Sequence, residues 1–332
     1  MVSFSERTLY TYLVGDDAAS VASKTKRADI PRDRWIQKIR ERLIIQYDTK
    51  TTTPVLNEDN PMSFVESLKV IAAGKDVLKS ESFALRHYKC HYFYGSAPER
   101  TKTSTTTSQS NLKAYASCIH DFALDPNNPF DVSALLPAFG FSSLLHEAIF
   151  AADASVSSYY TQDFGYVQPT LREVEMTDDE AKAHFGSSWE RLIKLYEVEQ
   201  PAKTLVAKTD YGFQYDIEVG NIIRNFFLKV RDNSLRNDVL CSRYRIRQYS
   251  PKTLELVESD WMHSQITDKQ EYGVENVDGA GVLVYKGLTF VVPEELGFFD
   301  TRGLKTGDLK LELTVGSVTG VADLTVVQEE IV

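Results

Sequence analysis

The segment GNIIRNFFLKVRDN, residues 220–233, has the β-branched and aromatic composition of a long β-strand, but its apolar residues do not alternate. Successive side chains of a strand point to opposite faces of a sheet, so Phe226, Phe227 and Leu228 place large apolar groups on both faces. A sheet with one face in water shows a period of two. The segment therefore predicts a β-protein in which this strand is covered on both sides.

The sequence from residue 205 onward consists of short β-rich segments that Gly, Asn, Asp and Pro separate. In DLKLELTV, Leu309, Leu311, Leu313 and Val315 alternate cleanly with polar residues. Turn signals at roughly 8–12-residue spacing without a long helix indicate an all-β sandwich. The strands that we predict here cover residues 219–231, 238–249, 253–266, 282–292, 296–301, 308–316 and 321–331.

Five segments of residues 33–177 correspond in pattern and order to segments of the C-terminal part. This correspondence predicts an internal duplication, in which 82–95 and 259–273 both end as aromatic strands. The pairs are DRWIQKIRERLIIQYD (33–48) with 220–233, SFALRHYKCHYFYG (82–95) with SDWMHSQITDKQEYG (259–273), DVSALLPAFGF (131–141) with LTFVVPEELGFF (288–299), LLHEAIFAADAS (144–155) with DLKLELTVGSVT (308–319), and TLREVEMT (170–177) with DLTVVQEE (323–330).

A helical connection is predicted between the two halves, at residues 177–200. Thr177 followed by Glu180 forms a capping box, and Gly186 is expected to interrupt or split the helix. Trp189, Leu192, Ile193 and Tyr196 then recur at helical spacing. The polar stretch TKTSTTTSQS (101–110) is predicted as a surface loop between strands.

The composition is that of a soluble protein that folds in a cytosol-like compartment. The 332 residues are 42% apolar and suffice for two domains, and the net charge of −10 argues against a protein that coats nucleic acid. No run reaches the roughly 18 apolar residues of a membrane span, and no signal peptide is visible. The three cysteines (Cys90, Cys118 and Cys241) are expected to be reduced and buried.

No catalytic, metal or cofactor site is expected. In HYKCH, His87 and His91 would share a face only on a helix, and on the predicted strand they lie about 13 Å apart. HEAIF has Phe150 where a zincin motif needs its second histidine, and the spacings of cupins, G-x-S-x-G elbows and P-loops are missing. DPNNPFD (125–131) offers calcium-binding oxygens, but a tight turn explains it fully.

A basic cluster lies between residues 24 and 42. Its eight basic residues minus three acidic ones give +5, which suggests a surface that faces anions, either lipid head groups or nucleic acid. The alternative is a strand edge that its charges protect against unwanted pairing. The cluster consists of Lys24, Lys26, Arg27, Arg32, Arg34, Lys38, Arg40 and Arg42.

The sequence resembles the double jelly-roll major capsid proteins of tectiviruses, corticoviruses and related icosahedral viruses, many of which enclose a membrane. The resemblance is carried by the duplicated strands at 33–48 and 220–233, the segments ending YFYG and KQEYG, and the closing strand pairs. The resemblance implies an all-β fold of two consecutive eight-stranded jelly-roll β-sandwiches joined by a short helical connection. The expected organisation is an N-terminal arm (1–32), a first jelly roll (33–176), a helical connector (177–204) and a second jelly roll (205–332).

The resemblance also implies a structural virion protein and not an enzyme. Three chains would form a pseudo-hexagonal homotrimeric capsomer that tiles an icosahedral shell, after folding in the host cytoplasm. Neighbouring capsomers, minor or penton proteins and internal-membrane head groups are the implied partners, with no cofactor and no specific nucleic-acid sequence. Two alternatives remain: a carbohydrate-binding or receptor-binding spike-like protein on the same sandwiches, and a bicupin-type enzyme, which the missing histidines disfavour.

Overall fold

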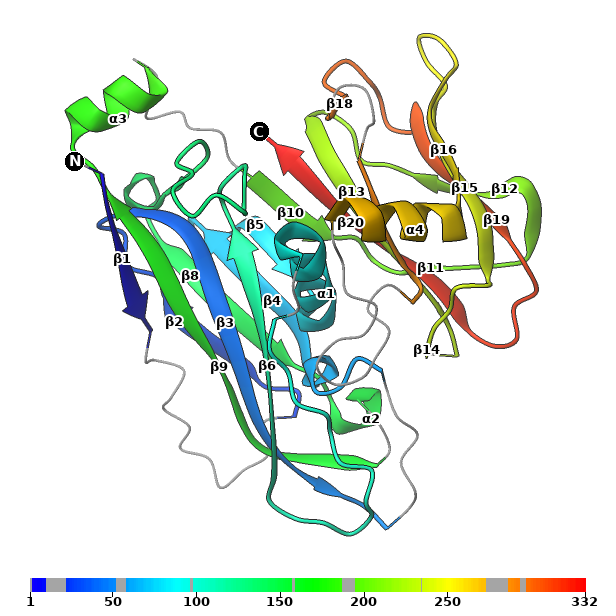
Figure 1. The fold of residues 1–332 in the computed structure, drawn as a ribbon, viewed down its shortest axis with the longest axis horizontal. Helices are drawn as coiled ribbons and strands as arrows, with labels where there is room; N and C mark the ends of the chain where they lie inside the picture. Colours follow the sequence, from blue (N-terminus) through cyan, green and yellow to red (C-terminus); the bar gives the residue numbers. More distant parts are fainter. Residues whose placement is uncertain are drawn as a thin grey trace. The chain divides into compact units, whose positions relative to one another are not determined.

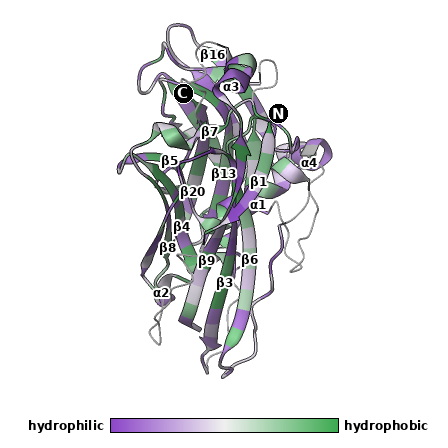
Figure 2. Ribbon diagram, turned by 90° about the vertical axis from the view of Figure 1, so that its left-hand side faces the viewer, coloured by the Kyte–Doolittle hydropathy of each residue, from purple (hydrophilic) through white to green (hydrophobic). Residues whose placement is uncertain are grey.

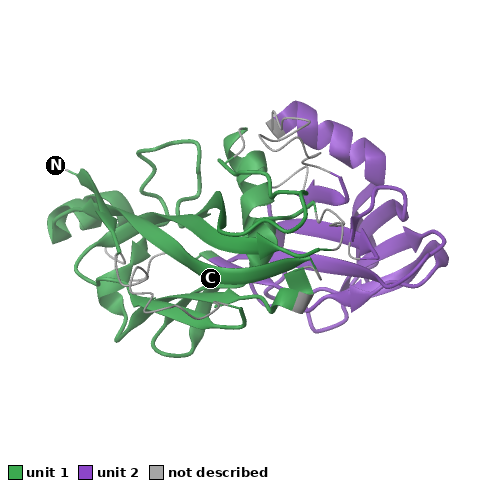
Figure 3. Ribbon diagram, turned by 90° about the horizontal axis from the view of Figure 1, so that it is seen from below, with its two compact units in different colours: residues 1–195, 279–282 green, residues 196–278, 283–332 purple. Residues whose placement is uncertain are grey.

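The computed structural model describes residues 2–9, 22–51, 58–95, 98–156, 159–186, 195–233, 235–272, 286–292 and 297–332. The chain forms two compact units. Unit 1 comprises residues 1–195, and unit 2 comprises residues 196–278 and 283–332 (Figure 3). In the described residues, no helix is long and apolar enough to span a membrane.

Unit 1 contains two antiparallel sheets whose strands lie side by side in Figure 1. The order of the first is β1-β9-β3-β6, and the short β7 pairs with β3; that of the second is β5-β4-β8-β2. The strands are β1 (Ser3–Thr8), β2 (Thr25–Asp29), β3 (Trp35–Thr49), β4 (Val65–Ala72), β5 (Asp76–Glu81), β6 (Leu112–Asp121), β7 (Leu136–Pro137), β8 (Leu144–Phe150) and β9 (Tyr160–Glu175).

The inward faces of these two sheets meet in the core of unit 1. On β3, Leu43, Ile45 and Tyr47 are buried while the intervening residues are half-buried or exposed, the alternation of a strand with one inward face. A Cβ added to Gly165 of β9 would lie 2.5 Å from Ile45 of the same sheet and 3.3 Å from Phe150 of the opposite sheet. Glycine is therefore needed where β9 approaches both layers closely.

Unit 2 repeats this arrangement, with its strands in two antiparallel layers. In the first, β13 lies between β20 and the short strands β14, β17 and β18, and β20 also has β10 and β11 beside it; the order of the second is β12-β19-β15-β16. The strands are β10 (Leu195–Glu199), β11 (Lys203–Thr204), β12 (Lys208–Asp216), β13 (Ile222–Asp232), β14 (Leu235–Arg236), β15 (Cys241–Gln248), β16 (Leu254–Asp260), β17 (Leu288–Val291), β18 (Phe299–Asp300), β19 (Leu309–Val315) and β20 (Ala322–Ile331).

The strand orders of the two units correspond. The long strands β3 and β13 occupy equivalent positions and pair with the closing strands β9 and β20, and β6 and β17 pair with their other sides. The second sheets, β2-β8-β4-β5 and β12-β19-β15-β16, match strand for strand. The predicted duplication is confirmed for 33–48 with 220–233 and for the last two segment pairs. The pairing of 131–141 with 288–299 was only approximate, because the topological counterpart of β17 is β6.

The segments predicted as aromatic strands at 82–95 and 259–273 are helices. They form α1 (Phe83–Tyr94) and α4 (Trp261–Tyr272), and the strand predicted over 253–266 ends at Asp260. Both helices directly follow the strand at the same end of these second sheets, β5 in unit 1 and β16 in unit 2, so the correspondence was right although the element type was wrong. Ten of the 12 residues of α1 are buried, which explains why its sequence lacks the amphipathic period of a surface helix.

The connector begins as predicted. In α3 (Asp178–Phe185), Thr177 and Glu180 form the capping box, and Gly186 follows the last turn. Helix α3 packs on unit 1, where Phe185 and Trp35 have ring centroids 5.8 Å apart. Trp189, Leu192 and Ile193 lie outside the described residues, and Tyr196 belongs to strand β10 instead of a helix. The short helices are α2 (Asp153–Val156), η2 (Met62–Phe64) and η3 (Ala138–Gly140).

Strand β13, which lies within residues 220–233, is buried on both faces. Phe226, Leu228 and Val230 belong to the core cluster of unit 2, which joins β13 and β20 to β15, β19 and Trp261 of α4. Phe227 points to the opposite face, where its ring lies 6.3 Å from that of Phe290. Figure 2 shows hydrophobic and hydrophilic residues interspersed along the long strands. A second copy of the chain is not required to bury Phe227, since its exposed fraction within one chain is 0%.

Candidate functional site

The basic cluster of residues 24–42 lies on β2, on β3 and in the segment that connects them. Four of its side chains form ion pairs with acidic groups, so a large part of its charge is balanced locally. Isolated pairs of this kind contribute little to stability when they are exposed. The pairs are Arg27 with Glu147 (2.6 Å), Arg34 with Glu175 (3.4 Å), Lys38 with Asp121 (3.4 Å) and Arg40 with Glu6 (2.6 Å).

The other four members differ in surroundings. Arg32 donates a 2.6 Å hydrogen bond to the carbonyl of Phe141, and the guanidinium of Arg42 lies 5.7 Å from the ring centroid of Tyr115. Lys24 and Lys26 are half-buried beside the strand edge that β2 forms. The cluster is therefore dispersed over several local environments and does not form one uniformly charged patch.

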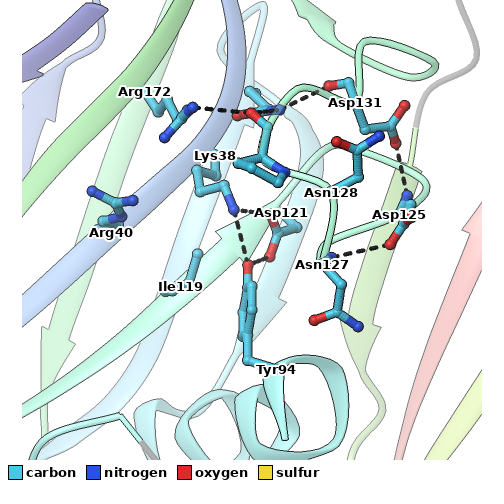
Figure 4. Close-up of polar contacts among 12 residues, drawn as sticks. Lys38, Arg40, Tyr94, Ile119, Asp121, Asp125, Asn127, Asn128, Asp131 and Arg172 are labelled. Atoms are coloured by element: carbon cyan, nitrogen blue, oxygen red, sulfur yellow. Dashed lines mark hydrogen bonds and ion pairs between the residues drawn. The ribbon is translucent and has the colours of Figure 1, made fainter. Parts of the chain in front are cut away.

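Lys38 belongs to a buried ion pair and not to a charged surface (Figure 4). Its ammonium lies 3.4 Å from the Asp121 carboxylate and donates to the Tyr94 hydroxyl at 3.3 Å. The Tyr94 hydroxyl in turn donates to Asp121, and burial together with this carboxylate raises the pKa of Tyr94 well above its usual value. Lys38 is 5% exposed, so it holds β3, β6 and the end of α1 together instead of facing an anion.

The loop at residues 125–131 forms the tight turn that the sequence suggested. The Asp125 carboxylate accepts a 3.0 Å bond from the backbone N–H of Asn127, and Asp131 accepts from the N–H of Asp125 at 2.7 Å (Figure 4). Burial raises the pKa of Asp131, but its hydrogen bonds to backbone N–H groups and Ser133 outweigh this effect and lower it overall. Side-chain oxygens of Asp125, Asn128 and Asp131 are thus engaged in the turn itself.

The HYKCH residues lie on α1, so His87 and His91 share a helical face after all. They are fully buried, with ring centroids 5.4 Å apart, and Nδ1 of His87 lies 2.7 Å from the carbonyl of Ser117. All three cysteines are buried free thiols, as predicted. Burial raises the pKa of both Cys90 and Cys241 to about 12, which leaves these thiols protonated and unreactive at neutral pH.

A cluster that no motif revealed lies in the core of unit 1. Glu41 of β3, His120 of β6 and His146 of β8 meet there, and all three side chains are fully buried. Glu41 Oε1 lies 2.6 Å from His120 Nδ1 and 3.1 Å from His146 Nε2. Because β3 and β6 belong to one sheet and β8 to the other, the cluster bridges the two layers of the sandwich.

The electrostatics of this cluster keep its acid ionised. Burial raises the pKa of Glu41, but the two imidazoles outweigh burial and hold that pKa at about 2. Burial lowers the pKa of His120 to about 4, against the opposing charge of Glu41. At neutral pH a carboxylate therefore sits in the core beside a neutral His120. Within the described part of the chain, this is the one group of three His, Cys, Asp or Glu side chains that could hold a metal ion.

Sequence reasoning passed over these residues because they share no local spacing. His120 and His146 are 79 and 105 positions from Glu41 in the sequence. A usable signal existed nonetheless: Glu41 stands between Ile39 and Leu43 on the inward face of β3, where every second residue should be apolar. Polar residues at inward positions of strands indicate a buried polar contact.

Comparison with solved structures identifies the fold. Over 99% of this chain and 96% of the other, the model resembles the crystal structure of the STIV MCP, from Sulfolobus turreted icosahedral virus, with a TM-score of 0.76 and 15% identity. The chain has the double jelly-roll fold. The PBCV-1 virus capsid gives a TM-score of 0.59 at 7% identity, over 100% of this chain and 94% of that one.

A third double jelly roll, the major capsid protein P2 of bacteriophage PM2, gives a TM-score of 0.55 at 10% identity, over 100% of this chain and 98% of that one. In sequence, no protein-family model and no curated protein matches. The expected fold class, two jelly-roll β-sandwiches in one all-β chain, is therefore confirmed by structural similarity. The proteins to which this double jelly roll is similar are structural components of viral shells, not enzymes.

Proposed function

We propose that this chain is the major capsid protein of an icosahedral virus. The observation that supports the proposal best is the duplicated jelly roll itself, matched over 99% of the chain to the STIV MCP. The match extends over 96% of that capsid protein, so the two chains are also alike in extent. A shell protein acts through its surfaces, and a catalytic constellation is not needed for this role.

The proposed building block is a homotrimer with pseudo-hexagonal outline. Two similar units repeated three times approximate six-fold symmetry, and hexagonal blocks can tile a closed shell. Within this scheme we retain the division into an arm (1–32), jelly rolls at 33–176 and 205–332 and a connector at 177–204. Strands β1 and β2 of the proposed arm pair with β9 and β8, which would tie the arm to the first jelly roll.

Size-exclusion chromatography with light scattering tests the assembly. We expect a stable particle of three chains, and electron microscopy of concentrated material should show hexagonal capsomers or shells. A monodisperse monomer that binds a glycan array would instead favour the carbohydrate-binding or receptor-binding reading. A monomer without either property would contradict the capsid proposal.

The proposed partners follow from the same role. Neighbouring capsomers and penton or minor proteins would contact the trimer edges, and the virion capsid would be its location after folding in the host cytoplasm. The basic cluster remains our candidate for contact with head groups of an internal membrane or with the genome. Lys24 and Lys26, half-buried beside β2, are the members whose contribution to such a contact we propose to test.

A further inference from the structure

The buried cluster of Glu41, His120 and His146 has the composition of a metal site. Two imidazoles and one carboxylate are a ligand set that zinc uses in proteins. The three donor atoms come from three strands in both sheets of unit 1 and lie within 4.8 Å of one another. Convergence of three ionisable side chains at one fully buried point calls for a physical reason.

Hydrogen bonds among the three residues do not fully offset the free-energy cost of burying them. Burying a carboxylate costs several times as much as burying a neutral polar group, and apolar residues of similar volume would fill the same space at lower cost. The cluster therefore carries a desolvation cost that its two internal hydrogen bonds leave partly uncompensated.

A fourth donor borders the cluster. The Sγ atom of Cys118 lies 3.7 Å from Glu41 Oε2, and Cys118 shares the inward face of β6 with His120 two residues away. With two neutral imidazoles, one carboxylate and one thiolate, a divalent cation would leave a net charge of zero. Charge neutrality is what a fully buried ion requires.

We propose that unit 1 binds one divalent transition-metal ion, with zinc as the best match, through Glu41, His120 Nδ1 and His146 Nε2, and that Cys118 supplies the fourth ligand. A tetrahedral ion with Zn–N and Zn–O bonds near 2.0–2.1 Å and a Zn–S bond near 2.3 Å holds its donors about 3.3–3.5 Å apart. Glu41 Oε1 lies 2.6 and 3.1 Å from the two imidazole nitrogens, and Cys118 Sγ lies 3.7 Å from the other carboxylate oxygen, Oε2. Small side-chain movements would bring the donors of Glu41, His120 and His146, all within 4.8 Å of one another, to this spacing, whereas the Cys118 side chain must turn further toward the imidazoles.

Binding replaces the hydrogen bonds from both imidazoles to Glu41, and each ring carries its proton on the nitrogen that does not bind the ion. The Cys118 thiol loses its proton to solvent, so one proton is released for each ion bound. The bound ion would link the two sheets of unit 1 as a structural cross-link. Because the four side chains are buried, the ion would enter during folding.

The test begins with the wild-type chain. After unfolding, removal of metal and refolding with excess Zn²⁺ or Co²⁺, elemental analysis should find one ion per chain that dialysis does not remove. The cobalt form should show the intense visible bands of a tetrahedral ion and a thiolate charge-transfer band. A folded protein that retains no stoichiometric zinc or cobalt, or a cobalt spectrum typical of octahedral coordination, would overturn the proposal.

Matched variants assign the ligands. His146→Gln and Glu41→Gln should abolish stoichiometric binding, whereas His184→Gln, on the exposed side of α3, should bind as the wild type does. Cys118→Ser should lose the charge-transfer band, and Cys241→Ser in unit 2 should keep it. Equal metal content in the His146 and His184 variants would refute the site. If ligand variants fail to fold, the wild-type cobalt spectrum still decides the question.

Discussion

At the residue scale, the two phenylalanines of β13 show why apolar and polar residues do not alternate in residues 220–233. Phe226 lies in the core cluster of unit 2, whereas Phe227 faces away from that cluster and is nevertheless fully buried. The apolar surface that each contributes is removed from water on opposite sides of one sheet. A strand covered on both faces does not need a polar residue at every second position.

Aspartate at either position should therefore block folding. Truncating a buried Phe costs about 3–5 kcal/mol, and a buried carboxylate adds a further desolvation cost. We expect Phe226→Asp and Phe227→Asp to be insoluble or to melt far below the wild type in calorimetry. Val239→Asp is the control, since Val239 is 83% exposed. Assembly of both Phe variants at wild-type levels would contradict the account of β13.

Asp268 of α4 is a second residue whose behaviour depends on burial. Its carboxylate accepts hydrogen bonds from Thr289 Oγ1 at 3.1 Å and from the Phe290 N–H at 3.0 Å, which fix α4 to β17. Burial raises the pKa of Asp268 to about 7, against the lowering effect of these two bonds. The folded state therefore binds this proton more tightly than the unfolded state, whose carboxyl has a pKa near 4.

The sign of the resulting pH dependence follows from this difference. Between about pH 4 and pH 7 only the folded state retains the proton, so the Asp268 contribution to stability falls by up to about 1.4 kcal/mol per pH unit. Asp268→Asn keeps an acceptor but does not titrate. We expect the Tm difference, variant minus wild type, to increase from pH 4 to pH 7 and then level off. A constant difference across this range would show that Asp268 does not have a raised pKa.

At the element scale, the helices α1 and α4 are the largest departure from the sequence prediction. Aromatic residues favour strands on average, and a helix buried on most sides has no polar face to reveal its period. End signals were present for α1: the Ser82 hydroxyl accepts from the Leu85 N–H at 3.5 Å, and Gly95 ends the helix with φ 64°. In this protein the caps at 82 and 95 were better indicators of helix than composition was.

The entry into β17 depends on one glycine. Gly287 has φ +65°, and an added Cβ would lie 2.7 Å from both the Val230 carbonyl and the Asn237 nitrogen. Its carbonyl accepts a 2.8 Å bond from the Val230 N–H, which aligns β17 with β13. Gly287→Ala should therefore lower stability by more than about 1 kcal/mol, because both the backbone angle and the contacts resist a side chain.

Calorimetric melting measures this effect, and Gly303→Ala is the matched control. A Cβ at Gly303 would meet nothing within 4 Å, and the residue has no positive φ. Equal Tm values for the two variants would mean that the chain can shift at 287 without cost. The comparison therefore isolates the backbone constraint from the general effect of removing a glycine.

At the scale of the whole molecule, net charge and its distribution bear on partners. The chain carries −10 overall, and the +5 of residues 24–42 is partly balanced by acidic residues from β1, β6, β8 and β9. The uneven distribution suggested by the sequence is thus smaller in the folded protein. Lys24 and Lys26 precede Arg27 of β2, in the segment whose contact with lipid can be tested.

If this segment contacts a membrane, charge reversal should weaken the contact. A basic residue near an anionic surface contributes about 1 kcal/mol, so the double variant Lys24→Glu and Lys26→Glu should bind phosphatidylserine vesicles at least about 30-fold more weakly. Sedimentation with vesicles at low salt measures this, with Lys208→Glu and Lys252→Glu, exposed lysines of unit 2, as control. Equal binding by both double variants would remove the segment as a lipid contact.

The class of the fold and the order of its strands can be recognised from local sequence patterns. Segments such as 33–48 and 308–316 carry their strand pattern locally, because burial against a sheet imposes a residue period that survives when identity between the repeats is low. The capping box of α3 could be predicted for the same reason, since Thr177 and Glu180 lie within one turn. Features that depend on neighbours in the sequence were therefore recoverable.

Features that depend on residues far apart in the sequence became visible only in the folded chain. It turned 82–95 into a helix, paired Lys38 with Asp121, and brought Glu41, His120 and His146 to one point from strands in two sheets. These outcomes follow from which strands lie opposite one another. Strand pairing is set by the packing of the whole unit, so no local spacing in the sequence records it.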